Sequence, residues 1–421
     1  MKKNILFVCA LALLVSSARA EGENSLEEQV KQLTQKVGDL SSLVQKQHEE
    51  IQSLQSEKMS SVSTPQTSVP VSSQGGPQGS KWNPEMGAVA DTLLLTGSGE
   101  KNPETFDRAS LRELEVVLGS NVDPYSRLDV TLSFSDSEDP GVEEGYLTYF
   151  GIPGLTARLG KFKPKVGKQA GVHRDSLDTA DEPLVIQQYF SEEGLSKSGV
   201  DFVKILDLPW DSVHEVSLGV LEGGSGEEGV TFGSARNRPV YYGHLKNYFD
   251  LTDVTSFELG LSGLLGSSDE DSKNEVSLLG VDLTAIHHFT ATQNVKFQSE
   301  FFGLHRDETL VERDLSEAPE VEPVEEKTEG SLWGAYALLD FRLDPRWALG
   351  LRYDQVQPIG NLLDNPEDHD QGVTAYLTFY QSEFARWRAQ VSHFDLADGE
   401  NNNQFLIQGT FAIGAHKHKL Q

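Results

Sequence analysis

From residue 82 onward the chain repeatedly alternates apolar and polar residues with a period of two. The alternation is clear in residues 127–134, 256–262, 346–353 and 373–380. A β-strand turns successive side chains to opposite faces, so this period predicts strands with one apolar face and one polar face. Because such segments recur as far as the end of the chain, residues 82–421 are expected to form one all-β domain.

About sixteen strand-like segments can be delimited, and most are near the length that a tilted strand needs to cross a bilayer. They are residues 86–95, 110–118, 124–135, 142–149, 155–161, 199–205, 212–221, 239–247, 253–264, 274–287, 293–304, 330–341, 345–354, 371–381, 384–395 and 402–413. Tight turns and longer polar connections alternate between them, and a soluble sandwich has no reason to show this parity. We therefore predict an antiparallel transmembrane β-barrel of about sixteen strands, with a lumen wide enough for water.

Three segments of a different character precede these strands. Residues 1–20 contain two lysines, a short apolar run and an Ala-Arg-Ala site, which predict a secretory signal peptide. Residues 24–58 place apolar side chains at alternating spacings of four and three, which predicts a short α-helical coiled coil in the periplasm. An amphipathic helix packed on its own domain is the alternative. Residues 59–81, rich in Ser, Pro, Gly and Gln, predict a flexible linker.

Composition and charge narrow the classes of function. The chain carries 65 acidic residues against 35 Lys and Arg, a formal charge of −30, which argues against nucleic acid as a partner because phosphate contacts need a basic face. The only cysteine, Cys9, lies in the signal segment, so the exported chain has no thiol nucleophile. We expect no enzyme activity, no cofactor and no metal, with a barrel-embedded hydrolase of dispersed residues as a remote alternative.

One stretch of this acidic chain is strongly basic. Residues 158–168, RLGKFKPKVGK, contain five cations and no acid, and they lead into the longest connection, residues 162–198. By parity this connection is the third outer loop. Loops of this length without secondary structure of their own are usually functional. Folded inward, the loop would narrow the lumen and carry its side chains to the tightest point.

The basic stretch RLGKFKPKVG, the strand plan and the closing strand QFLIQGTFAIG resemble the general porins and, more closely, the phosphate-selective porin O and P family, over residues 82–421. The resemblance implies a homotrimer in the outer membrane of a Gram-negative bacterium, in contact with its lipid. It also implies a third loop inside the pore and a basic path that draws small anions such as phosphate. The positions that it places at the constriction are Arg158, Lys161, Lys163, Lys165, Lys168, His173 and Arg174. Strand alternation adds Arg346, Arg352, Arg386 and Arg388 to the inward face.

Two features leave the selectivity of such a channel open. Four acids between Asp175 and Glu182 follow the basic stretch in the same loop, so a mixed-charge constriction is an alternative. Alternation also places Lys161 on the lipid side with Leu159 unless the strand ends or bulges there. If Lys161 does face lipid, the alternative is that the lysines form a solvated outer rim that binds lipid phosphates.

Two further expectations concern other parts of the chain. Residues 305–329 hold ten acids between Asp307 and Glu329, which predicts a solvated outer loop, with a divalent-cation bridge to lipid phosphates as the alternative. For the whole protein the main expectation is a channel for passive diffusion of small hydrophilic solutes. The alternative is a structural tether, in which the coiled coil joins the outer membrane to peptidoglycan.

Overall fold

The computed structural model describes residues 84–98, 108–136, 139–208, 212–224, 231–232, 238–269, 274–312, 324–362 and 365–414. All of these belong to one compact unit, Pro77–Gln421. The expected signal peptide at 1–20, coiled coil at 24–58 and linker at 59–81 lie outside the described residues. In the described part of the chain, no helix has the length and apolar composition that a membrane span requires.

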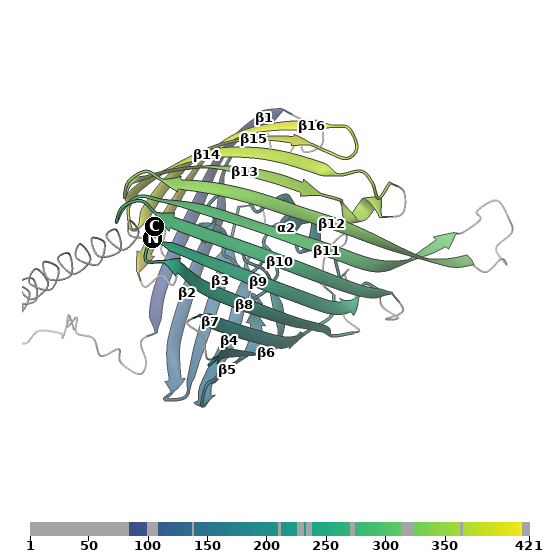
Figure 1. Ribbon diagram of the computed structural model, residues 1–421, viewed down its shortest axis with the longest axis horizontal. Coiled ribbons are helices and arrows are strands. Elements are labelled where there is room, and N and C mark those ends of the chain that lie inside the picture. The colour runs from purple at the N-terminus through teal and green to yellow at the C-terminus, as the bar shows by residue number, and fades with distance from the viewer. Residues whose placement is uncertain are drawn as a thin grey trace, which may run out of the picture. The chain divides into compact units, whose positions relative to one another are not determined.

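The described residues form sixteen antiparallel strands that close into a barrel in chain order, which confirms the predicted fold class (Figure 1). The barrel closes where the first strand pairs with the last, from Gly87 opposite Gly414 to Ser98 opposite Asn403. Closure leaves no strand edge unpaired. The strands are β1 Glu85–Ser98, β2 Arg108–Asp123, β3 Ser126–Phe134, β4 Gly141–Ile152, β5 Leu155–Phe162, β6 Lys197–Leu206, β7 Val213–Leu221, β8 Val240–Thr252, β9 Thr255–Ser267, β10 Glu275–His288, β11 Asn294–Glu312, β12 Val324–Arg342, β13 Trp347–Val356, β14 Asp370–Ser382, β15 Ala385–Asp395 and β16 Asn401–Gly414.

The two mouths of the barrel differ in their connections. At one mouth β2 joins β3, β4 joins β5 and β14 joins β15 through tight turns, and β1 begins and β16 ends there too. The longer connections, including the one from β5 to β6, lie at the other mouth. The parity read from the sequence therefore matches the arrangement of the strands.

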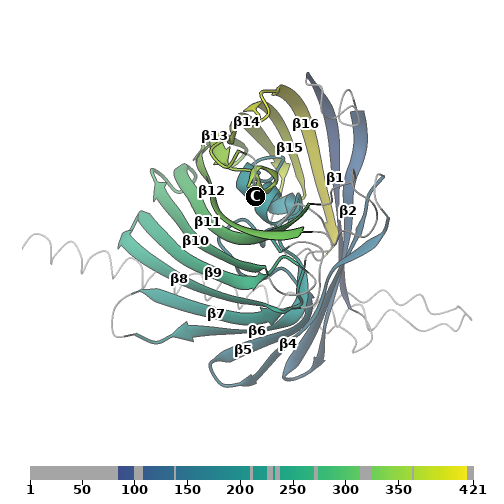
Figure 2. The same cartoon turned by 90° about the vertical axis from the view of Figure 1, so that its right-hand side faces the viewer.

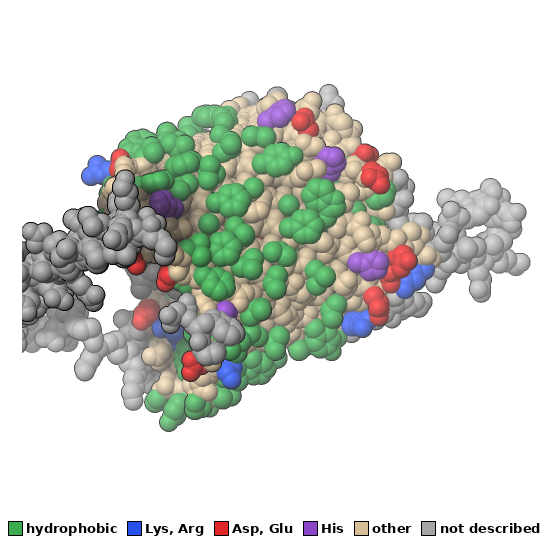
Figure 3. Space-filling view, in the orientation of Figure 1, with side chains coloured by type: hydrophobic (Ala, Val, Ile, Leu, Met, Phe, Trp, Pro, Cys, Tyr) green, Lys and Arg blue, Asp and Glu red, His purple; other side chains and the backbone are tan. Residues whose placement is uncertain are grey.

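The wall of the barrel has an apolar outer face and a polar inner face. Outward-facing side chains such as Leu159, Leu279 and Phe301 are exposed, and Figure 3 shows apolar side chains spread over the wall with charged ones near its rims. Inward-facing Glu300 and Arg352 are buried. A water-soluble barrel shows the opposite distribution, so this wall suits lipid on its outside.

One strand pair is longer than the sequence predicts. β11 and β12 remain paired as far as Glu312 opposite Val324, so residues 305–312 and 324–329 belong to a hairpin. The sequence predicted a loop over 305–329, whereas these residues continue the two strands. An ion pair of 2.7 Å between Lys327 Nζ and Asp307 Oδ2 helps to offset the repulsion between the acids of the two strands.

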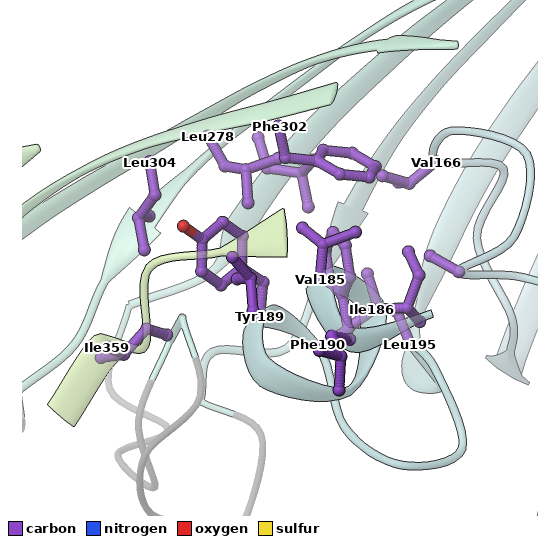
Figure 4. Close-up of a cluster of buried hydrophobic side chains, with 14 of the residues drawn as sticks. Val166, Val185, Ile186, Tyr189, Phe190, Leu195, Leu278, Phe302, Leu304 and Ile359 are labelled. Atoms are coloured by element: carbon purple, nitrogen blue, oxygen red, sulfur yellow. The ribbon is translucent and has the colours of Figure 1, made fainter. Parts of the chain in front are cut away.

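The connection from β5 to β6, residues 163–196, lies inside the barrel and is called the inner loop below (Figure 2). It contains a 3-10 turn, η1 Arg174–Ser176, and a short helix, α2 Leu184–Tyr189; a second 3-10 turn, η2 Ile359–Asn361, follows β13. Side chains of α2 pack against inward-facing residues of β10 and β11 (Figure 4). Toward the long-loop mouth the lumen therefore holds an apolar core, although the barrel size alone predicts water there.

Candidate functional site

The inner loop begins because the sequence stops the β5 ladder. Phe162 is fully buried, and Pro164 cannot donate a ladder hydrogen bond. Gly167 then adopts a φ of +58°, and a Cβ at this position would lie 2.1 Å from Glu300 Oε2. The turn lets the backbone N–H groups of Lys168 and Gln169 donate to Glu300 at 2.7 and 2.8 Å. A carboxylate of β11 thus fixes the start of the loop.

Arginines from β15 hold the middle of the inner loop. Arg388 donates to the carbonyl oxygens of Leu177 and Thr179, each at 2.7 Å. Arg386 donates to the carbonyl oxygen of Asp175 at 2.7 Å. This part of the loop has no strand partner, and its buried carbonyls need donors from elsewhere. The guanidinium groups therefore serve as the missing hydrogen-bond partners of the loop.

Arg352 of β13 has the same role. Its Nη1 donates to the Asp181 carbonyl at 2.8 Å, and its Nε to Asp354 Oδ2 at 2.7 Å. Arg352, Arg386 and Arg388 are only 1–3% exposed. Alternation predicted correctly that they face inward, but their expected place at a solute constriction was wrong, because the loop carbonyls cover them.

Two other predicted cations lie outside the lumen. β5 keeps a regular register up to Phe162, so Lys161 shares the outward face of Leu159, and its Nζ donates to the Val142 carbonyl at 2.7 Å. Arg346 is exposed in the tight turn before Trp347, where β13 begins. The expectation that these two side chains face the solute path was wrong for both. Lys161 follows the alternation of β5 to the outward face, and Arg346 lies in the turn before β13 begins.

Three more predicted residues lie at or near a buried group of acids. A β-bulge in β4 turns the successive residues Glu143 and Glu144 toward the lumen. Lys163 Nζ lies 2.9 Å from Glu143 Oε1, and His173 Nε2 lies 3.1 Å from Glu144 Oε2. Arg174 follows in η1, with Nη2 3.7 Å from a Glu193 carboxylate oxygen. Lys163 and His173 reach the lumen only through small exposed areas.

Ion pairing fixes the protonation of this group. Burial alone would lower the pKa of Lys163, but the charge of Glu143 and the hydrogen bond to it outweigh burial and raise the pKa. Burial would likewise lower the pKa of His173, but hydrogen bonds with Glu115, Glu143 and Glu144 raise the pKa well above 6.5. Both cations are therefore committed to the acids of β2 and β4 and are poor contacts for a passing solute.

The remaining predicted cations border open space. A cavity of about 360 Å³ lies between the start of the inner loop and the β4–β9 wall. Lys165 Nζ is 2.6 Å from Glu215 Oε1, and Lys168 Nζ is 2.6 Å from Glu258 Oε1. Lys246 Nζ of β8 is 2.9 Å from the other oxygen of Glu258. The space beside the loop is therefore lined by paired charges of both signs, as the mixed-charge alternative proposes.

Arg158 completes this lining from β5. Its Nε donates to Asp201 Oδ1 at 3.1 Å, and its guanidinium lies over the Phe162 ring at 4.5 Å from the centroid. Tyr242 also donates to Asp201, at 2.6 Å, so this carboxylate has two partners and Arg158 is held against the wall.

Sequence reasoning missed Glu215, Lys246 and Glu258. The signal for Glu258 was present, because it alternates with Phe257 and Leu259 and must face inward. The pattern does not show which strands lie opposite the start of the inner loop across the lumen. In the structure these are β7, β8 and β9.

The closed sixteen-strand sheet with an inward connection after the fifth strand defines the porin fold. No protein-family model matches the chain. It is 28% identical over 338 residues to an uncharacterized protein of Aquifex aeolicus strain VF5, across 73% of this chain and 69% of that one.

Several solved outer-membrane channels have a similar fold. The chain matches an anion-selective porin from Comamonas acidovorans with a TM-score of 0.52 and 9% identity, over 79% of this chain and 99% of that one. It matches OprB of Pseudomonas putida with a TM-score of 0.52 and 9% identity, over 79% and 94%. It matches the outer-membrane channel DcaP of Acinetobacter baumannii with a TM-score of 0.50 and 10% identity, over 79% of this chain and 96% of that one. At such identities the likeness is one of fold.

Proposed function

We propose that the protein is an outer-membrane channel of a Gram-negative bacterium, through which small hydrophilic solutes diffuse passively. The apolar outer wall suits contact with outer-membrane lipid, and the inner wall is polar. The inner loop fills part of the lumen and leaves a charged cavity beside it. The solute path passes between the loop and the β4–β9 wall, along the partly exposed charges of Lys165, Lys168 and Lys246.

We further propose a modest preference for anions, phosphate among them. The observation that carries it is the sharing of Glu258 by two cations, Lys168 and Lys246. The Lys165 and Lys246 side chains are 40% and 36% exposed, whereas those of Glu215 and Glu258 are 21% and 12% exposed. An entering ion therefore meets ammonium groups before carboxylates, and low-dielectric walls focus their field.

The resemblance to the phosphate-selective porin O and P family is part of this proposal and rests on the RLGKFKPKVG stretch and the strand plan. It supports a homotrimer as the assembled form. A second role, as a tether to peptidoglycan through residues 24–58, rests on the heptad pattern alone. Deletion of residues 24–81 tests that role, since a normal envelope in cells with the shortened chain would contradict it.

Single-channel recording in planar bilayers tests the proposed channel. The purified full-length protein is inserted between unequal concentrations of KCl, with protein unfolded by boiling as the control. We expect discrete conductance steps and a reversal potential on the chloride side of zero, and a smaller chloride current when phosphate competes for the path. A reversal potential on the potassium side contradicts the anion preference, and the absence of steps contradicts the channel itself.

A further inference from the structure

A buried group of potential metal ligands includes His173, which also lines the cavity. Glu115 of β2, Glu143 of β4 and His173 of the inner loop bring one ligand atom each within 4.8 Å of one another. All three residues are buried. Because they come from three separate elements, a ligand held by all of them would join the inner loop to the barrel wall.

The histidine of this group has the orientation of a metal-binding imidazole. His173 Nδ1 lies 3.4 Å from Glu115 Oε1 and 3.2 Å from Glu143 Oε1, so it points between the two carboxylates. His173 Nε2 lies 3.1 Å from Glu144 Oε2 on its other side. Metal-binding histidines commonly donate their second N–H to a carboxylate, which fixes the tautomer and the ring orientation. Glu144 occupies this supporting position.

The carboxylates also have unused acceptor capacity. In the described part of the chain, Glu115 Oε2 and Glu143 Oε2 are shielded from solvent and accept no hydrogen bond. Glu115 is 2% exposed and Glu143 is 7% exposed. Lys163 Nζ reaches only Oε1 of Glu143. Buried carboxylate oxygens without a partner are costly, and a cation between them removes that cost.

We propose that Glu115, Glu143 and His173 form a binding site for a divalent transition-metal cation of the Mn²⁺ or Zn²⁺ type. Two carboxylates and one imidazole suit these ions better than Ca²⁺ or Mg²⁺, which prefer oxygen ligands alone. The ion takes the place of the proton between His173 Nδ1 and the carboxylates, and that proton is released to solvent. The bound ion fixes the inner loop against β2 and β4, whether or not the barrel conducts.

Titration of the full-length protein with Mn²⁺ tests the site. The protein is purified in detergent, treated with EDTA and dialysed, and bound Mn²⁺ is measured from the loss of the free-ion electron paramagnetic resonance signal. We expect about one strongly bound Mn²⁺ per chain, displaced by Zn²⁺. Glu115→Gln and Glu143→Gln should each weaken binding by at least about 10-fold. Unchanged affinity in both variants overturns the proposal and leaves an ion-pair cluster only.

A second group of potential ligands provides the matched control. His305, Asp307 and Glu329, where β11 and β12 extend beyond the core, also bring ligand atoms close together, but they are largely exposed. The variant His305→Asn should retain strong Mn²⁺ binding. If binding is lost there and kept in Glu115→Gln, the metal belongs to the exposed group and the proposal fails.

Thermal unfolding tests the site without the glutamate variants, which could fail to fold. In the His305→Asn protein, which keeps all three proposed ligands, saturating Mn²⁺ should raise the temperature at which heat-modifiable gel migration changes, because a ligand bound only to the folded state stabilises it. No rise in that temperature overturns the proposal.

Discussion

The ammonium group of Lys168 lies 2.6 Å from one oxygen of Glu258, and the other oxygen of the same carboxylate lies 2.9 Å from Lys246. Two cations on opposite sides of the lumen cavity therefore share one acid. The basic stretch that stands out in the sequence reaches the lumen already paired. Its effect on a passing ion depends on the balance of paired charges and cannot be obtained from a count of lysines.

Removing either sign of charge from this group should move selectivity in opposite directions. Glu258→Gln leaves Lys168 and Lys246 without their shared carboxylate, so the ratio of chloride to potassium permeability should rise several-fold. Lys246→Gln leaves one lysine for one acid, so the ratio should fall toward unity. Reversal potentials in asymmetric KCl measure both changes.

Lys161→Gln is the matched control for these variants. It removes a lysine from the same basic stretch, but one on the outward face of β5, so the permeability ratio should stay as in the unmodified protein. A shift for Lys161→Gln as large as that for Lys246→Gln would show that general surface charge, and not the lumen cavity, determines selectivity.

The arginines that hold the inner loop should control pore size. Arg388→Met removes a donor from each of the carbonyls of Leu177 and Thr179. The Leu177 carbonyl keeps only the longer bond from Arg386, at 3.4 Å, and the Thr179 carbonyl loses its donor at a cost of about 1–3 kcal/mol. The loop should detach part of the time, so single-channel conductance should increase and fluctuate more. Arg346→Gln, at an exposed turn, should leave the conductance unchanged; equal effects of the two variants would contradict a loop-holding role for Arg388.

The fold was largely predictable because strand alternation is a local property. The period of two places Arg352, Arg386 and Arg388 on the inward face, and the structure has them there. Tight turns at every second connection likewise give the parity of the barrel. Alternation also placed Lys161 on the lipid side. The family resemblance placed it at the constriction instead, and that placement was wrong.

The roles of inward-facing residues were not predictable in the same way. Whether Arg388 meets a solute or a carbonyl depends on where the inner loop lies, and that is decided by contacts between residues more than a hundred positions apart, such as Lys168 with Glu300. The β-bulge that turns both Glu143 and Glu144 inward also leaves no simple mark in the sequence.

Packing between α2 and β12 provides a steric test of the buried loop. A Cβ on Gly334 would lie 2.6 Å from Val185 Cγ2 and 2.8 Å from Val356 Cγ2, so Gly334→Ala must displace one of them. Overpacking of this kind costs about 1–3 kcal/mol. The free energy of unfolding by urea in detergent, followed by tryptophan fluorescence, should fall by that amount. Gly303→Ala on β11 meets only Phe301 Cε1 at 3.8 Å and should have little effect. Equal losses would argue against a packed helix.

The carboxyl of Glu182 should make the stability of the inner loop depend on pH. Burial raises the pKa of Glu182 to about 8, although Lys163 and Arg352 act to lower it. Because the folded pKa is raised above 4.5, the stabilising contribution is complete below pH 4.5 and is lost as pH rises through about 8.

Glu182→Gln removes this titration, so its free energy of unfolding should fall less between pH 5 and pH 9 than that of the unmodified protein. The difference should be on the order of 1–3 kcal/mol. Urea unfolding in EDTA at several pH values measures it without interference from bound metal. Glu193→Gln alters a loop carboxylate that is 43% exposed and should keep the original slope. If Glu182→Gln also keeps that slope, the loss of stability at high pH arises from another group, and the Glu182 carboxyl is not held in its neutral form by the inner loop.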